Sequence, residues 1–244
     1  LVNLAHGALY MMGAYFALMF IALGFFPLTI SILLAMMLCA ILGMVIEWFA
    51  YRPLRRQPRL TALISAVGVS IFLQNLAMLI WGTHPLSFPD PFEGFGIKVL
   101  GSRISYLQIS IFGIAAVLMI LLHLYVQKTR MGRAMRATAE DPETASLMGV
   151  PMNRVISLTF AIGSALAAVA GIMIGAYYNS IYPTMGYFIG LKAFAAAVLG
   201  GIGNLPGAMA GGLTLGIIEI MAIAFGLPSG YQHAISFVIL IVIL

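Results

Sequence analysis

Ionisable side chains inside apolar runs are the residues of this sequence most able to carry chemistry. Glu219 lies well within such a run, where a carboxylate either lines a polar pathway or bonds to a neighbouring helix. Glu47 lies within two turns of Arg52, so a local ion pair or a side chain reaching toward the interface suffices for it. Lys192 and His6, near the ends of predicted helices, allow the same explanation. The sequence contains no convincing Ser–His or paired-carboxylate arrangement and no P-loop, so neither catalysis nor ATP binding by that motif is indicated.

A glycine-rich segment from 199 to 207, with the sequence LGGIGNLPG, interrupts the apolar runs. It cannot continue a regular helix, and irregular backbone at membrane depth must be buried in protein or line a water-filled cavity. A tight turn between two helices explains it equally well. The small residues at 207, 211, 212 and 216 are spaced for close helix packing, within or between subunits. The candidate pathway or helix-packing residues of this segment are Gly200, Gly201, Gly203, Asn204 and Gly207.

The first residues contain a similar pattern. The sequence NLAHGA at 3–8 resembles NLPGA at 204–208 with one gap, and each pattern leads into a helix rich in small residues. The two segments then form a short same-direction repeat. Asn3, His6 and Gly7 therefore join Glu219 and the glycine-rich segment as candidate pathway or helix-packing residues.

A polar, charged segment from 127 to 154 separates two long apolar runs. Asp141 as N-cap and Pro142 at the first helical position predict a helix start, and Gly149 supplies the left-handed residue that ends the helix. The predicted helix has about two turns, too short to be stable alone in water. It must pack on the membrane surface, on its own bundle, or in a groove of a cytoplasmic partner. The docking candidates are Asp141, Pro142, Glu143, Ala145, Leu147, Met148 and Gly149.

The composition places the chain among membrane proteins. Hydrophobic residues make up 62% of the sequence and charged residues 8%, against about a quarter charged in soluble domains. The net charge of +5 sits mainly in short loops, so it reports membrane topology rather than nucleic-acid binding. Cys39 is the only cysteine, which excludes a disulfide framework and a thiolate metal site, and the four histidines are scattered.

Apolar runs of about 17 to 25 residues predict an all-α bundle of about seven or eight transmembrane helices, forming one permease-like domain over 1–244. The run from 188 to 199 is too short for a regular span and is either broken or re-entrant. Neither an initiator Met nor a signal peptide precedes the first run, and the last run is about half a span, so we expect truncation at both ends. The predicted spans are 8–24, 28–49, 60–81, 106–126, 155–178 and 208–225, with another beginning at 235–244.

The basic residues fix the predicted topology. Nine of the 12 Lys and Arg residues lie in two loops, 51–59 and 127–154, and two spans separate these loops. Both loops therefore lie on one side, which the positive-inside rule makes cytoplasmic. The loop 82–105 and the uncharged stretch 179–186 are then placed on the outer, periplasmic side.

Several stretches together resemble one family, the Liv-type branched-chain amino acid permeases, which form the H-subunit branch of bacterial ABC importers. The similarity extends over nearly the whole chain. The stretches that carry it are NLAHG at 3–7, LISA at 63–66 with IFLQN at 71–75, RMGRA at 130–134, AED at 139–141 with ASLMG at 145–149, and KAF at 192–194 with GGIG at 200–203.

This resemblance implies an inner-membrane permease that pairs with a second, related permease. Two cytoplasmic ATPase subunits would bind ATP and Mg²⁺, so that this chain binds no cofactor, and a periplasmic binding protein would deliver leucine, isoleucine or valine. The resemblance also identifies 143–149 as the coupling segment, whose family pattern is Glu-Ala-Ala-x-x-x-Gly. Glu143, Ala145 and Gly149 match this pattern, whereas Thr144 departs from it and the downstream Ile-x-Leu-Pro is missing.

Three other functions are compatible with the sequence. Urea or short-chain amides are substrates of related permeases. A channel is a second alternative, because the Asn-Leu-Pro-Gly turn resembles the paired turns of aquaporins, although here both segments lie on one face. A secondary transporter is the third, but it would place several ionisable residues within the membrane, where Glu219 stands nearly alone.

Overall fold

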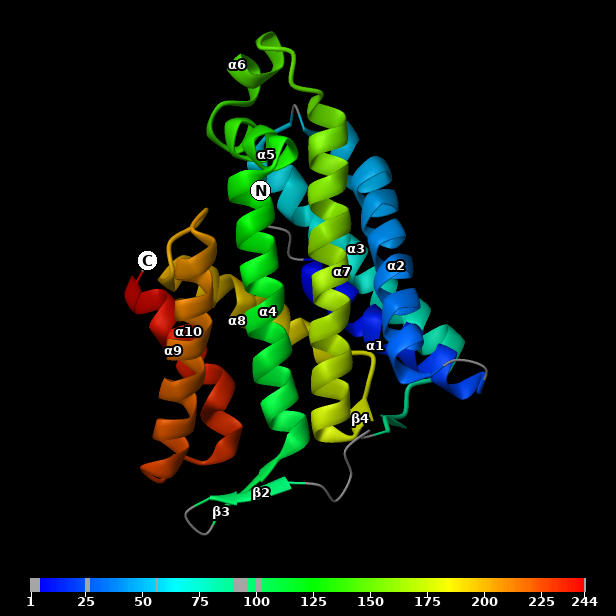
Figure 1. The fold of residues 1–244 in the computed structure, drawn as a ribbon, viewed down its shortest axis with the longest axis vertical. Coiled ribbons are helices and arrows are strands. Elements are labelled where there is room, and N and C mark those ends of the chain that lie inside the picture. The colour runs from blue at the N-terminus through cyan, green and yellow to red at the C-terminus, as the bar shows by residue number, and fades with distance from the viewer. Residues whose placement is uncertain (1–4, 25–26, 56, 90–95, 100–101, 244) are drawn as a thin grey trace.

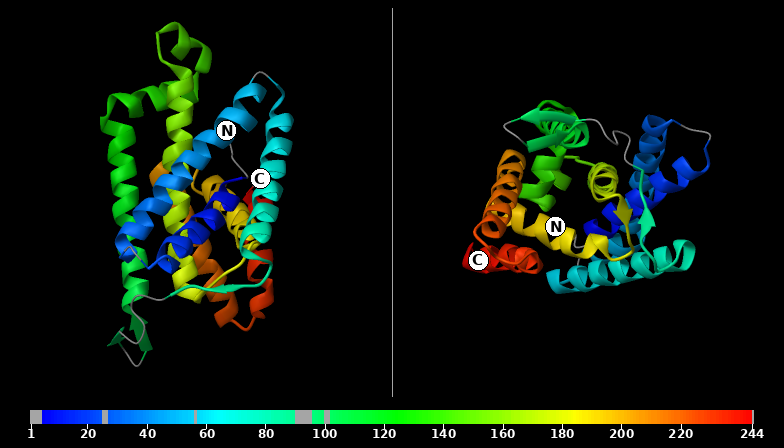
Figure 2. Two further views of the ribbon diagram at one scale, coloured as in Figure 1. Left: turned by 90° about the vertical axis from the view of Figure 1, so that its right-hand side faces the viewer. Right: turned by 90° about the horizontal axis from the view of Figure 1, so that it is seen from below.

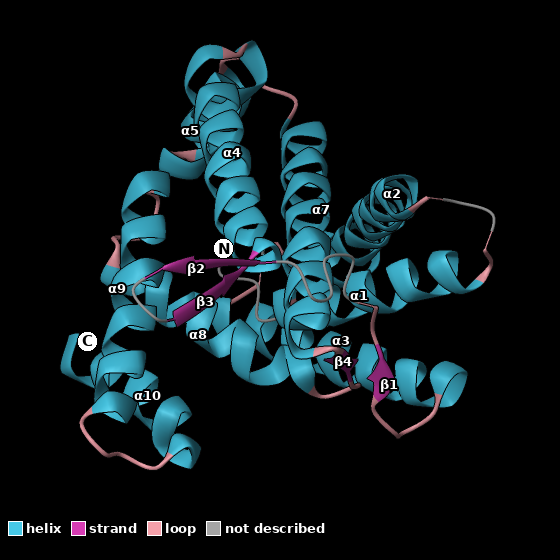
Figure 3. Cartoon of the chain, turned by 60° about the horizontal axis from the view of Figure 1, so that its bottom comes forward, coloured by secondary structure: helices cyan, strands magenta, loops and turns pink. Residues whose placement is uncertain are grey.

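The computed structural model describes residues 5–24, 27–55, 57–89, 96–99 and 102–243. Most of these residues are helical, and the strands form two short antiparallel pairs (Figure 3). The elements in chain order are α1 (His6–Ala22), α2 (Leu28–Ile46), η1 (Glu47–Tyr51), η2 (Arg52–Leu54), α3 (Arg59–Trp81), β1 (Leu86–Ser87), β2 (Gly96–Val99), β3 (Ser102–Ser105), α4 (Tyr106–Lys128), α5 (Arg130–Glu140), α6 (Pro142–Leu147), α7 (Met152–Tyr178), β4 (Ser180–Ile181), α8 (Met185–Leu199), α9 (Leu205–Ala224), η3 (Ser229–Tyr231) and α10 (Gln232–Ile243).

The predicted all-α membrane architecture is confirmed. Within the described residues, five helices are long and apolar enough to cross a membrane, and α1 and α8 are shorter apolar helices. With 15 residues α8 is about 22 Å long, less than the about 30 Å of a hydrocarbon core. Viewed along the long axis, α7 is seen end-on and α8 lengthwise, so α8 crosses the bundle (Figure 2). The short run near 188–199 is therefore an oblique helix.

Helix α1 lies at the centre of the bundle. Its residues from Gly7 to Tyr15 are all buried, and it packs against α2, α7, α8 and α3. A helix that is apolar on every side is stable only when neighbouring helices surround it, as they do here. Helices α8, α9 and α10 form a second group, which α1 joins to the rest through α8 (Figures 1 and 2).

Contacts between loops confirm the predicted grouping of the loops at the two ends of the bundle. Arg55 Nη1 in the first basic loop donates a hydrogen bond of 2.7 Å to Asn153 Oδ1 in the second, so both loops lie at one end. At the other end β1 pairs with β4, with Leu86 opposite Ile181, which joins the two predicted outer segments. The hairpin β2–β3 also projects from that end (Figure 1).

A buried ionic cluster holds the cytoplasmic ends of α2 and α7 together. Glu47, in the π-helical turn η1, is 0% exposed and forms an ion pair with Arg55. The hydroxyl of Ser157 on α7 donates to Glu47 Oε2 at 2.6 Å. The expected local ion pair therefore forms, but with Arg55 and not Arg52, and the expectation of a side chain reaching toward the interface is wrong. Glu47 instead turns inward, because a cation and a hydroxyl from two other segments compensate its burial.

Small residues bring α8 and α9 into backbone contact. A Cβ on Gly200 or Gly207 would overlap the backbone of the other, and one on Gly211 would overlap the carbonyl oxygen of Ala196. Gly216 faces open space among the described residues. The spacing at 207 and 211 thus serves packing within this chain, as small residues do between helices in membranes.

The Glu47 cluster predicts a non-additive pair of substitutions. Arg55→Ala leaves a fully buried carboxylate without its cation and should destabilise the protein by about 3 kcal/mol. Adding Glu47→Gln removes that charge while keeping its shape, so the double variant should recover much of the loss. Thermal unfolding in detergent micelles measures both; additive losses would show that the two side chains do not act as a pair.

The contact between α8 and α9 predicts that replacing glycine by alanine affects stability differently at two positions of α9. Gly211→Ala should lower the unfolding temperature, because overpacking costs about 1 to 3 kcal/mol. Gly216→Ala, on the same helix with nothing to displace, should leave it unchanged or raise it. Equal losses in both variants would mean that the α8–α9 contact is not the cause.

Candidate functional site

The cytoplasmic end of the bundle carries a helical hairpin, α5–α6. Thr129 begins α5: its Oγ1 accepts a 2.9 Å hydrogen bond from Gly132 N and donates to the Tyr125 carbonyl. A Cβ on Gly132 would overlap the backbone at the end of α4, so only glycine allows this sharp turn. As a result α5 folds back at the end of α4, and α6 projects beyond every other helix at that end (Figure 1).

Both ends of α6 are fixed by local hydrogen bonds, as the sequence predicts. Asp141 Oδ1 accepts from Glu143 N at 3.0 Å and from Thr144 N at 3.2 Å. The Thr144 hydroxyl, followed by these backbone N–H groups, holds the pKa of the Asp141 carboxyl below its usual value. At the other end Gly149 has a φ of 82°, and Gly149 N and Val150 N close the turn on the carbonyls of Ser146 and Ala145.

The docking candidates of α6 divide into an inner and an outer set. Ala145 is 5% exposed and packs inside the hairpin, so its side chain does not contribute to the outer surface. This differs from the expectation that Ala145 contacts a partner directly. Leu147 and Met148 are 87% and 81% exposed. Asp141, Pro142, Glu143 and Gly149 are exposed as well, and their visible role is to shape the helix.

A second site lies inside the bundle, where the two repeated sequence patterns meet. A cavity of about 490 Å³ is bounded by the start of α1, α7, α8 and the turn between α8 and α9. His6 comes from the first pattern and Gly201, Gly203 and Asn204 from the second, about 200 residues away. Asn3 lies outside the described residues. The remaining lining residues are Thr159, Phe160, Gly163, Gly190, Ala193, Phe194, Ala197, Ile202, Leu205 and Ala208.

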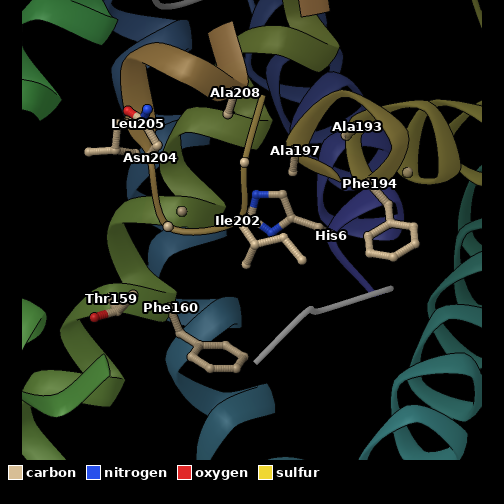
Figure 4. A pocket seen from close by; sticks show the side chains of 14 residues that line it. His6, Thr159, Phe160, Ala193, Phe194, Ala197, Ile202, Asn204, Leu205 and Ala208 are labelled. Carbon is tan, nitrogen blue, oxygen red and sulfur yellow. The ribbon is translucent and has the colours of Figure 1, made fainter. Parts of the chain in front are cut away.

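The imidazole of His6 is the central polar group of this cavity. Figure 4 shows it between Ile202 and Phe194, surrounded by the other lining side chains. The Thr159 hydroxyl points away and donates to the Val155 carbonyl at 2.8 Å. Asn204 caps α9 by accepting from Gly207 N at 3.2 Å. Among the described residues His6 has no hydrogen-bond partner, so its ring nitrogens are available to a ligand.

The other candidate residues serve packing. Gly7 and Gly186 are in backbone contact where α1 crosses the start of α8, and Gly200 and Gly207 do the same for α8 and α9. Glu219 does not line the cavity. It is buried on α9 and bonds to Lys192 Nζ of α8 at 2.8 Å and to the Ser236 hydroxyl of α10. Of the two readings of Glu219, bonding to neighbouring helices is the one the geometry supports.

The apolar walls of the cavity are not predicted from the sequence. Phe160, Gly163, Phe194 and Ala197 belong to ordinary apolar runs, where neither composition nor spacing marks a cavity. One signal was present: Thr159 and Gly163 are four residues apart on α7 and so share a helix face. No three His, Cys, Asp or Glu side chains gather as a metal site in the part of the chain that the structure describes.

Comparisons with known proteins agree with a membrane permease. The chain is 43% identical over 256 residues to the high-affinity branched-chain amino acid transport system permease protein LivH of Escherichia coli (strain K12), covering 100% of this chain and 83% of that protein. It is 44% identical over 257 residues to the corresponding protein BraD of Pseudomonas aeruginosa, with the same coverage. The autoinducer 2 import system permease protein LsrC of Enterobacter sp. (strain 638) is 30% identical over 195 residues, 76% of this chain and 55% of that protein.

No solved structure matches the chain. A family model described as "Branched-chain amino acid transport system / permease component" matches residues 1–244. Helices able to cross a membrane and basic loops at one end make the chain a multi-pass protein of the inner membrane. By this full-length match, the chain belongs to the family of permease components of branched-chain amino acid transport systems.

Proposed function

We propose that the chain is one of two permease subunits of an ABC importer that moves leucine, isoleucine and valine into the cytoplasm. Two ATPase subunits bind ATP and Mg²⁺ on the cytoplasmic side, and a periplasmic binding protein delivers the substrate. The substrate assignment is supported by the similarity to LivH and BraD over the whole chain, whereas the match to LsrC is lower and partial.

The exposed pair Leu147 and Met148 is the observation that carries the coupling proposal. Two large apolar side chains at the tip of a cytoplasmic hairpin stabilise nothing within this chain, and burying each in a partner is worth about 1.5 to 3 kcal/mol. The helix that presents them is capped at both ends, so its shape is fixed before a partner binds. A short capped helix with an apolar tip fits a groove on an ATPase.

Helix α7 connects this hairpin to the membrane. It begins two residues after Val150 and packs on α1 and α2, and the Glu47 cluster fixes its first turns. When ATP draws the two ATPases together, the docked hairpins move with them, and the start of α7 follows. Transport then requires that ATP and substrate favour different states of the permease pair.

Charging the tip of α6 should detach the ATPases. Leu147→Glu with Met148→Glu replaces the apolar contacts by carboxylates and should abolish both copurification with the ATPase subunits and leucine uptake. Ile97→Glu is the matched control, an exposed apolar residue in the outer hairpin, and should keep the complex intact. If the doubly substituted permease is monodisperse and still copurifies, the docking proposal is wrong.

The same cells test the substrate. Uptake of labelled leucine should be competed by isoleucine and valine and unaffected by urea or acetamide. Uptake of urea in place of leucine would refute the substrate assignment while leaving the docking result to stand.

The cap of α6 gives a second, milder test. Asp141→Ala removes the side-chain acceptor that begins the helix and should weaken ATPase binding several-fold, because the short helix must then be ordered by the partner. Asp141→Asn keeps an equally good capping oxygen and should bind like the unsubstituted protein. Titration of purified ATPase against the permease in nanodiscs compares the two; equal weakening would point to the charge of Asp141 rather than its cap.

A further inference from the structure

The cavity around His6 is bordered by helix ends of opposite partial charge. Three helix ends border it: His6 is the first residue of α1, Leu205 and Ala208 belong to the first turn of α9, and Ala197 lies in the last turn of α8. The N-terminal end of a helix carries partial positive charge and its C-terminal end partial negative charge. Two ends that favour an anion and one that favours a cation therefore border the same cavity.

The remaining walls are apolar. Phe160, Phe194 and Ile202 surround the imidazole ring, and glycine or alanine occupies most of the other positions (Figure 4). The cavity's volume of about 490 Å³ is within the about 300 to 1,000 Å³ range of small-molecule sites. A ligand suited to these walls is small and mostly apolar, with an anionic and a cationic group close together.

From this geometry we infer that the cavity is a binding site for the amino acid zwitterion within the permease, an inference that rests on the proposed import function. The carboxylate lies at the His6 imidazole, near the starts of α1 and α9, and the ammonium group lies at the carbonyl end of α8. The aliphatic side chain packs against Phe160, Phe194 and Ile202. Each charge that loses water in the membrane thereby meets a compensating group.

Gly163 sets the size of this site. A Cβ on Gly163 would lie 3.1 Å from His6 Cε1, so even alanine would press on the imidazole, and valine would fill part of the cavity. Restricting the cavity should therefore slow bulky substrates more than small ones.

Chemical labelling tests occupancy of the cavity. The sequence has a single cysteine, the buried Cys39, so Cys39→Ala removes the one thiol of these 244 residues. A cysteine at Ala193 or Ala197 should react with a small methanethiosulfonate reagent, and leucine loaded by the binding protein should slow that reaction in the assembled complex. Ala196→Cys, on the side of α8 that meets α9, is the control and should show no protection by leucine. Equal labelling of the lining cysteines with and without leucine would overturn the inference.

Transport rates test the roles of the residues. With the binding protein saturated, His6→Leu, which loses the donor at similar size, should lower leucine transport about tenfold or more, and His6→Gln should retain most of it. Gly163→Val should slow leucine more than alanine. Each variant must still copurify with the ATPases, which establishes that it folds. Transport at the wild-type rate in His6→Leu, or equal slowing of leucine and alanine in Gly163→Val, would refute this binding site. The proposed import function would still stand in that case, because it is tested by leucine import in the unsubstituted complex.

Discussion

The close approach of α1 to its neighbours is the constraint on which the rest of the structure depends. A Cβ on Gly171 would overlap the carbonyl oxygen of Tyr10, and Gly13 lies against Ala168 in the same way. Lipid tails are as apolar as leucine, so helices in a membrane gain from dispersion contacts and not from leaving the solvent. Small residues on α1 and α7 maximise those contacts. They also hold α1, whose first residue is His6, close against α7.

Local signals predicted local structure well. The caps of α6 at Asp141 and Gly149, the turn before Asn204 and the placement of both basic loops at one end all follow from side-chain chemistry or charge within a few residues. What the sequence could not reveal is long-range pairing. Glu47 accepts a hydrogen bond from Ser157, which is 110 residues away in the sequence, and the burial of the carboxylate depends on that partner. The cavity walls were equally hidden in the sequence. An apolar residue that lines a cavity and one that faces lipid are of the same residue types, so the sequence does not distinguish them.

Helix α7 connects the two candidate sites. The α5–α6 hairpin joins the start of α7, and Thr159, Phe160 and Gly163 line the cavity two to three turns further along. The Glu47 cluster lies between them, at Asn153 and Ser157. The cytoplasmic tip and the cavity are thus joined through the short connection 148–151 and the first turns of α7.

The pairing of β1 with β4 gives that helix a fixed outer end. β4 begins two residues after α7 ends, and its backbone bonds to β1 tie it to the segment that follows α3. The inner end of α7 is tied as well, through the bonds of Asn153 to Arg55 and of Ser157 to the buried Glu47. Helix α7 is therefore tied at both ends, by backbone pairing at the outer face and by the Glu47 cluster at the inner face. Because Phe160 and Gly163 lie between these two ties, a displacement of α7 at the level of the cavity has to release the Glu47 cluster or the β1–β4 pairing.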